Sequence, residues 1–174
     1  MLIPVESTRT NREGVMSETI KQELFAAELM EILEEVFDTH HGVLLDEGTS
    51  LYATLGGITA EEASAAIAEE TVSIAAHVEH VIFYLDVLGR HIAGDEIGEL
   101  DWSEIWERVG VVTKAEWDDL RGRLQAKYRW LVEILEGIDD WQTNDAVGAS
   151  IAILAHTACH LGVIRQAVTG IRRS

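Results

Sequence analysis

The sequence contains one proline and one cysteine among its 174 residues, and it is poor in aromatic and basic residues. Because the only proline is Pro4, no proline interrupts a helix in the rest of the chain. The single thiol, Cys159, excludes an internal disulfide and fits a reducing compartment, so we expect a cytoplasmic protein. Thirteen basic residues against 31 acidic ones give a net charge of −18. This charge argues against a nucleic-acid partner and against binding to an anionic membrane.

The composition predicts an all-α fold. Hydrophobic residues make up 47% of the chain, which excludes disorder throughout. Alanine, leucine, glutamate and isoleucine are abundant, and all but isoleucine are strong helix formers. No apolar run approaches the roughly 20 residues of a membrane span. We expect a flexible tail over residues 1–16 and a single domain over residues 17–174.

Apolar residues recur at helical spacing in four long segments. The predicted helices run from Ser17 to about Leu45, from Glu70 to about Ala93, from the Thr113 cap to about Gly137, and from Asn144 or Asp145 to about Gly170. Thr113 followed by Glu116 is a capping box. Shorter helices are expected over residues 60–68 and around Trp102 and Trp106. Four long amphipathic helices with short extra helices in the connections predict a four-helix bundle.

The last helix contains His156 and His160 inside an otherwise almost entirely apolar run, IAILAHTACHLGVIRQA. Residues four apart lie on one face of a helix, one turn apart, so both imidazoles can point at one ion. An unpaired buried imidazole is destabilising, by about 1–3 kcal/mol. One divalent metal ion would bind both histidines together. The pair therefore indicates a metal site.

A third ligand is expected from the second long helix. At about 100° per residue, His77 lies about 60° from the middle of that helix's apolar row, and His80 lies about 120° away. We therefore predict His77, His156 and His160 as the metal ligands, with water in the remaining position, as in catalytic zinc sites. For His77 alone, a hydrogen-bonded core histidine is the simpler interpretation.

Two other metal-binding motifs are excluded because the glutamates that they require are absent. A zincin needs glutamate directly after the first histidine, and Thr157 occupies that position. A di-iron bundle needs Glu-x-x-His on two helices, and no histidine of this chain has glutamate three residues before it. The site is therefore expected to hold one ion. Cys159 is expected to pack against its neighbours and not to act as a ligand or a nucleophile, and the pair His40 and His41 is expected to lie at a helix end.

Two pairs of motifs resemble the DinB/YfiT-like superfamily of metalloenzymes. The segment HTACHLGVIRQA at 156–167 is similar to that family's last-helix motif, and SIAAHVEHV at 73–81 is similar to its second-helix motif. The stretches LGGITAEEA at 55–63 and VTKAEW at 112–117 also resemble family members. The resemblance covers about residues 17–171. It implies a four-helix bundle, often a homodimer, with a three-histidine site for zinc, nickel or a similar divalent ion, and the matching positions here are His77, His156 and His160.

Two functions follow as hypotheses. The first is a metal-dependent enzyme with a small-molecule substrate, in which the ion activates water (a hydrolase) or a low-molecular-weight thiol (a transferase); relatives of the family include thiol transferases. Trp102, Trp106 and Trp130 are candidates for an apolar substrate pocket, although packing within the bundle is the simpler explanation for them. The second is a non-catalytic module for binding or dimerisation, in which a structural ion links two helices. His80 is the nearest candidate for the fourth protein ligand that this second function requires.

Overall fold

The computed structural model describes residues 20–66, 72–102, 104–141 and 144–173. Within these ranges the chain is all-helical: it forms six α-helices and one 3-10 helix, and its only β-type pairing is an isolated bridge between Ala66 and Ser73. The elements are α1 (Gln22–Phe37), α2 (Leu51–Gly56), α3 (Ala60–Ser64), α4 (Ile74–Ile92), η1 (Glu104–Glu107), α5 (Lys114–Glu136) and α6 (Asn144–Ile171). The all-α prediction is confirmed. The predicted tail over residues 1–16 lies outside the described residues.

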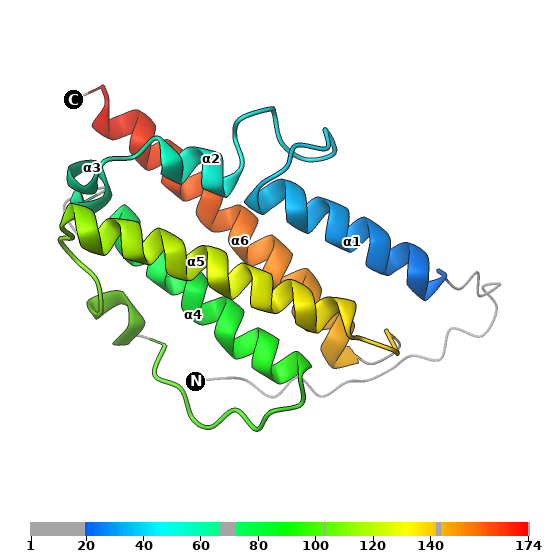
Figure 1. Cartoon of the computed structure of the whole chain (residues 1–174). Coiled ribbons are helices and arrows are strands. Elements are labelled where there is room, and N and C mark those ends of the chain that lie inside the picture. The colour runs from blue at the N-terminus through cyan, green and yellow to red at the C-terminus, as the bar shows by residue number, and fades with distance from the viewer. Residues whose placement is uncertain (1–19, 67–71, 103, 142–143, 174) are drawn as a thin grey trace, which may run out of the picture.

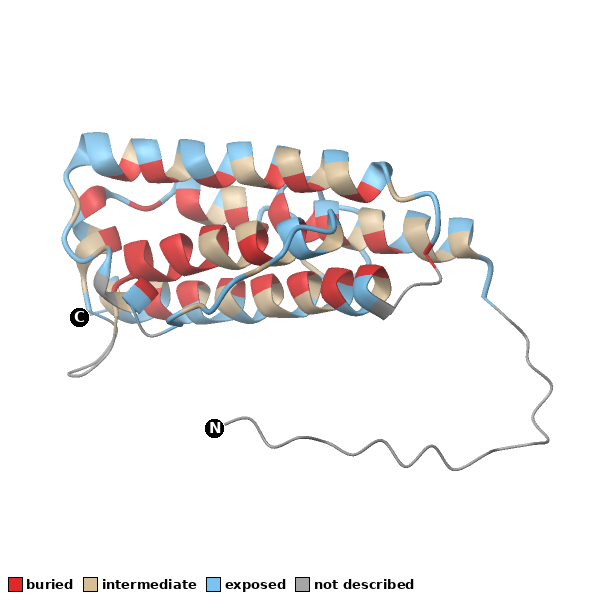
Figure 2. Ribbon diagram, turned by 90° about the horizontal axis from the view of Figure 1, so that it is seen from below, coloured by how far each residue is buried: buried red, intermediate tan, exposed pale blue. Residues whose placement is uncertain are grey.

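The four long helices α1, α4, α5 and α6 lie side by side, and the short helices α2 and α3 cover the end where the chain terminates (Figure 1). α4 packs against both α5 and α6, and α1 packs against α6. The buried residues follow the inward faces of these helices (Figure 2). On α1 and α5, the rings of Phe37 and Tyr128 stack with their centroids 4.1 Å apart.

Most helix boundaries agree with the prediction: α4, α5 and α6 end within one residue of their predicted ends. The predicted start of the first helix at Ser17 was wrong, because α1 begins at Gln22 with Lys21 as its cap. The Thr113 side chain accepts from the backbone N–H of Glu116, and the Glu116 carboxylate accepts from the backbone N–H of Thr113, which confirms the capping box at the start of α5. Thr59 and Glu62 form a second capping box at the start of α3. α6 begins at Asn144, as predicted. α4 begins at Ile74, with Ser73 as its cap, and the predicted start at Glu70 lies outside the described residues.

The prediction that the first helix continues to Leu45 was wrong. α1 ends at Phe37 because the following loop folds back around the carboxylate of Glu35. This carboxylate is 1% exposed and accepts five backbone N–H groups, from His41, Gly42, Val43, Leu44 and Leu45. Burial alone would raise the pKa of Glu35, but these hydrogen bonds outweigh it and lower the pKa to about 2.

The apolar stretch in α6 is longer than we expected from the sequence. It contains an 18-residue window with the length and composition of a membrane span, although only 33% of that window is buried in the fold. A core helix of a soluble protein passes the same test, so this is weak evidence for a membrane. Figure 1 shows α6 (orange to red) packed among the other long helices for most of its length. One face of α6 nevertheless remains exposed.

Candidate metal centre

The two central helices bring four histidines together. α6 contributes His156 and His160, whose ring centroids lie 4.4 Å apart, one helical turn from each other. α4 contributes His77 and His80, which are 9% and 8% exposed. The predicted residues His77, His156 and His160 therefore do lie in one cluster. The structure adds His80 to it.

Two contacts between α4 and α6 hold the cluster. His77 Nδ1 lies 2.9 Å from His160 Nδ1, and His80 Nε2 lies 3.0 Å from His156 Nε2. Each contact needs one ring nitrogen that carries a proton and one that offers a lone pair. All four imidazoles are therefore suited to the neutral state, which is the state that binds metals.

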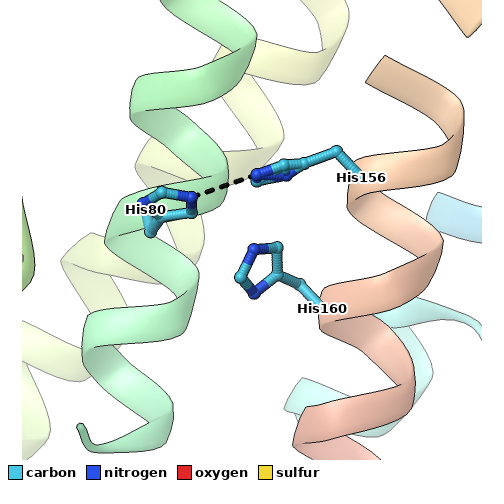
Figure 3. A group of neighbouring side chains, drawn as sticks. All are labelled: His80, His156 and His160. Atoms are coloured by element: carbon cyan, nitrogen blue, oxygen red, sulfur yellow. Dashed lines mark hydrogen bonds between the residues drawn. The ribbon is translucent and has the colours of Figure 1, made fainter. Parts of the chain in front are cut away.

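Three of the four histidines form a group with metal-binding spacing. The ligand atoms of His80, His156 and His160 all lie within 4.8 Å of one another. Figure 3 shows the three rings turned toward a common space between α4 and α6. A tetrahedral ion with bonds of 2.0–2.1 Å holds its ligand nitrogens about 3.3 Å apart, so small ring movements would close this group around an ion.

The interior around the cluster leaves one polar atom without a partner. His80 Nδ1 is buried and makes no hydrogen bond. Such an atom is destabilising unless something binds it. His80 therefore has two polar nitrogens in the interior: Nε2 contacts His156, and Nδ1 is open to a hydrogen bond such as one with a bound water.

Aromatic side chains cover the cluster. Trp106, on η1, stacks on His80 with ring centroids 4.1 Å apart and 12° between the planes, and its ring meets His77 edge-on at 5.2 Å. The Tyr84 ring lies 3.6 Å from the ring of His156. Trp102 contacts Tyr84 from outside and is 43% exposed. Trp106 thus contacts the cluster directly and Trp102 reaches it only through Tyr84, whereas Trp130 packs beside Lys127, on the α5 side of the fold.

Burial keeps the imidazoles uncharged. Burial, together with the positive charges that neighbouring histidines would carry, lowers the pKa of His160 to about 3. The pKa of His80 falls to about 4 for the same reasons, and burial lowers the pKa of His77 and of His156. Near neutral pH the cluster therefore presents lone pairs and not positive charges, which favours binding a cation.

No family model, curated protein or solved structure matches the chain. The resemblance to the DinB/YfiT-like superfamily therefore rests on the sequence motifs alone, and the site must be interpreted from its own geometry. That geometry contains imidazoles from two helices, and the metal-spaced group among the described residues contains no carboxylate. An all-nitrogen ligand set suits zinc, nickel, copper or iron better than magnesium or calcium.

The sequence reading that turned His80 away from the interior was wrong. It measured His80 against the apolar row of α4, but α4 is buried on nearly every side over residues 74–82, where α5, α6 and η1 surround it. The available signal was the spacing of His77 and His80, since residues three apart on a helix are neighbours. The prediction that Cys159 packs against its neighbours was also wrong, because its side chain is exposed, and Cys159 is not a member of the metal-spaced group.

The remaining histidines lie outside the cluster. His40 and His41 follow the end of α1 and contact Glu35 and Glu34, at 3.2 Å and 2.8 Å. His91, near the end of α4, lies 3.7 Å from a carboxylate oxygen of Asp145. None of the three belongs to the metal-spaced group. They serve as natural controls for mutagenesis of the site.

Proposed function

We propose that this protein is a metal-dependent enzyme of the DinB/YfiT-like type, acting on a small molecule as a hydrolase or as a thiol transferase. The observation that carries the proposal is the spacing of His80, His156 and His160, with all ligand atoms within 4.8 Å. The second contact from α4, between His77 and His160, supports it. A divalent ion bound there would supply Lewis acidity, lowering the pKa of a water or thiol so that it becomes a nucleophile near neutral pH.

The residues of the chain have separate tasks in this proposal. His156 and His160 bind the ion from α6, and His80 binds it from α4. His77, the ligand predicted by the resemblance, either binds directly or orients His160 through the 2.9 Å contact between their Nδ1 atoms. Trp106 and Tyr84 exclude water from the rings, which strengthens the electrostatic attraction of the site for a cation.

The fold supports the same assignment. We propose that α1, α4, α5 and α6 form the four-helix bundle that the resemblance implies, with the metal site between α4 and α6. In helical bundles, metal sites are built from inward side chains on facing helices. The two central helices here contribute two histidines each, at i, i+3 on α4 and at i, i+4 on α6.

A second candidate function has its own observation. The cluster contains four histidines, so His77 can complete an all-protein, four-nitrogen set. A closed tetrahedral set is typical of structural metal sites, which leave no position for a substrate. In that case the ion would link α4 to α6 in a non-catalytic binding module.

Cobalt substitution separates the two functions. The apoprotein is loaded with Co²⁺, whose visible absorption reports coordination, and azide or a small thiol is then added. An enzyme site has an open position, so we expect the spectrum to change with saturable dependence on the added ligand. A spectrum that does not respond indicates the closed, structural site. Failure of Co²⁺ to bind at all contradicts both functions.

A further inference from the structure

A groove between α4 and α5 combines basic side chains with an apolar wall. We propose that this groove is a second ligand site, for a small organic anion with an apolar, ring-sized body. Its volume is about 550 Å³, within the range of small-molecule sites. The inference does not depend on the proposed metal chemistry, because the groove and the histidine cluster lie on different faces of α4.

The groove is built from matching stripes on two neighbouring helices, which lie side by side (Figure 1). The stripe on α4 consists of Glu79, Ile82, Phe83 and Asp86. The stripe on α5 consists of Arg123, Ala126, Lys127 and Trp130. Both follow the spacing i, i+3, i+4, i+7, which keeps residues on one helix face. At about 100° per residue, the middle of the α4 stripe lies about 140° from the middle of the pair His77 and His80.

Ion pairs between the two helices hold basic side chains at the groove. The two Nη atoms of Arg123 each lie 2.9 Å from a different carboxylate oxygen of Glu79, which is 7% exposed. Lys127 Nζ lies 2.6 Å from a carboxylate oxygen of Asp86. An arginine carries five N–H donors and a lysine three, so each cation keeps donors for a ligand. On its other side, Arg123 also interacts with Asp119.

Arg108, which follows η1, adds a third cation with a weaker partner. Its Nη2 atom lies 3.7 Å from the carboxylate of the exposed Glu104, beyond hydrogen-bond distance. The lining of the groove thus has three basic side chains and two acidic ones, whereas the whole chain has 13 basic and 31 acidic residues. A local excess of positive charge in an acidic protein attracts an anion that the rest of the surface repels.

The aromatic residues of the groove decide against a cationic ligand. Lys127 Nζ lies 4.1 Å from the centroid of the Trp130 ring, and the Arg108 guanidinium lies over the Phe83 ring, 5.5 Å from its centroid. The chain's own cations therefore already use these ring faces. A neutral apolar molecule would leave the basic side chains unused, and an inorganic anion would leave the apolar wall unused. An anion with an apolar body uses both.

The apolar wall is formed before any ligand binds. A Cβ atom at Gly89 would lie 2.5 Å from the Trp130 ring, so glycine lets this ring pack directly against α4. Ala126 lies in the same stripe, is exposed and has a small side chain, so it leaves room for a ring beside Trp130. A preformed wall lowers the cost of ordering side chains when a ligand binds.

Binding of 2-naphthoate to the full chain tests the ligand class. We expect saturable binding with a Kd below about 1 mM by isothermal titration calorimetry. The neutral analogue 2-naphthamide and inorganic phosphate should each bind at least about tenfold more weakly, since one lacks the charge and the other the apolar body. No binding of 2-naphthoate, or equal affinity for either comparison compound, overturns the proposal.

Charge-removing variants test the basic side chains. Arg108→Gln and Lys127→Gln should each weaken 2-naphthoate binding at least about threefold. Arg123 is unsuited to this test, because its removal would leave the buried Glu79 carboxylate unpaired. Lys114→Gln removes an exposed cation at the start of α5 and should leave the affinity unchanged. Equal affinities in the wild type and the two groove variants contradict the proposal.

A steric variant tests the location of the ligand. Ala126→Phe places a ring inside the groove, so 2-naphthoate binding should be lost while the helical content by circular dichroism stays unchanged. Ala53→Phe, the same change at an exposed position on α2, should bind normally. His160→Ala should also bind 2-naphthoate normally, because the carboxylate does not bind at the histidine cluster. Binding that survives Ala126→Phe, or that is lost in His160→Ala, places the ligand outside the groove and overturns the proposal.

Discussion

The Nε2 atoms of His80 and His156 lie 3.0 Å apart, although 76 residues separate them in the chain. This contact joins α4 to α6 at the level where His160 and His77 make the second cross-helix contact, at 2.9 Å. Two such contacts, one turn from each other, fix the relative register of the two helices. They also place four lone-pair donors around one small volume.

The two histidines of α4 should contribute unequally to metal binding. His80 belongs to the metal-spaced group and has a buried, unpartnered Nδ1, so His80→Ala should abolish stoichiometric binding. His77 contacts His160 instead, and His77→Ala should weaken binding about 10–100-fold, as loss of an orienting partner does. Isothermal titration with Zn²⁺ measures both affinities. The reverse order of effects would make His77 the ligand, as the family resemblance implies.

Removing the metal should leave the chain folded. The helices that would bind the ion are already joined by buried apolar residues, including Ile74, Val78 and Val81 on α4 and Ile153 and Leu161 on α6. A ligand stabilises the native state only through its own binding free energy. We therefore expect EDTA to lower the Tm without abolishing the cooperative unfolding transition. Circular dichroism measures both. Complete unfolding by EDTA at 25 °C would favour the structural-ion function.

Glu35 should control stability at low pH. Its folded-state pKa of about 2 lies below its ordinary value of 4.5, so the unfolded chain binds more protons between these values. The stabilisation is complete above pH 4.5 and is lost as the pH falls from 4.5 toward 2. Glu35→Gln should lower the Tm at pH 7 and flatten the Tm profile across this window. Glu31→Gln, at an exposed position on the same helix, should do neither.

Two helical glycines should respond to alanine in opposite directions. Gly89→Ala places a Cβ 2.5 Å from the Trp130 ring, so we expect destabilisation of about 1–3 kcal/mol by overpacking. Gly122, on α5, has open space around it, and Gly122→Ala should stabilise the protein by about 0.5–1 kcal/mol through helix propensity. Urea denaturation measures both changes. Equal effects at the two sites would contradict the close packing of α4 on Trp130.

The parts of the fold that the sequence predicted depend on local chemistry. The capping boxes of Thr59 and Thr113 involve residues three apart, so they can be identified without knowing what packs where. The end of α1 could not be predicted, because it depends on the Glu35 carboxylate binding a loop up to ten residues away. α2 is difficult to predict from sequence, because Gly48, Gly56 and Gly57 around it indicate turns.

The histidines of the metal site were likewise predictable only where local spacing decides their position. His156 and His160 could be paired from spacing alone, since i, i+4 positions share a helix face in any context. Which histidine of α4 joins them depends on how α5, α6 and η1 surround that helix, and this is tertiary information. Trp106 stacks on His80, but the connection that contains Trp106 has no repeating sequence pattern. This contact could therefore not be predicted from the sequence.

The metal content of untagged protein tests the central claim most directly. Elemental analysis by mass spectrometry should find about one zinc, nickel or similar ion per chain in the wild type, and His160→Ala should lose it. His91→Ala, a histidine outside the cluster, should retain the ion. Equal, near-zero metal in all three proteins after purification in metal-supplemented buffer would contradict a metal centre between α4 and α6.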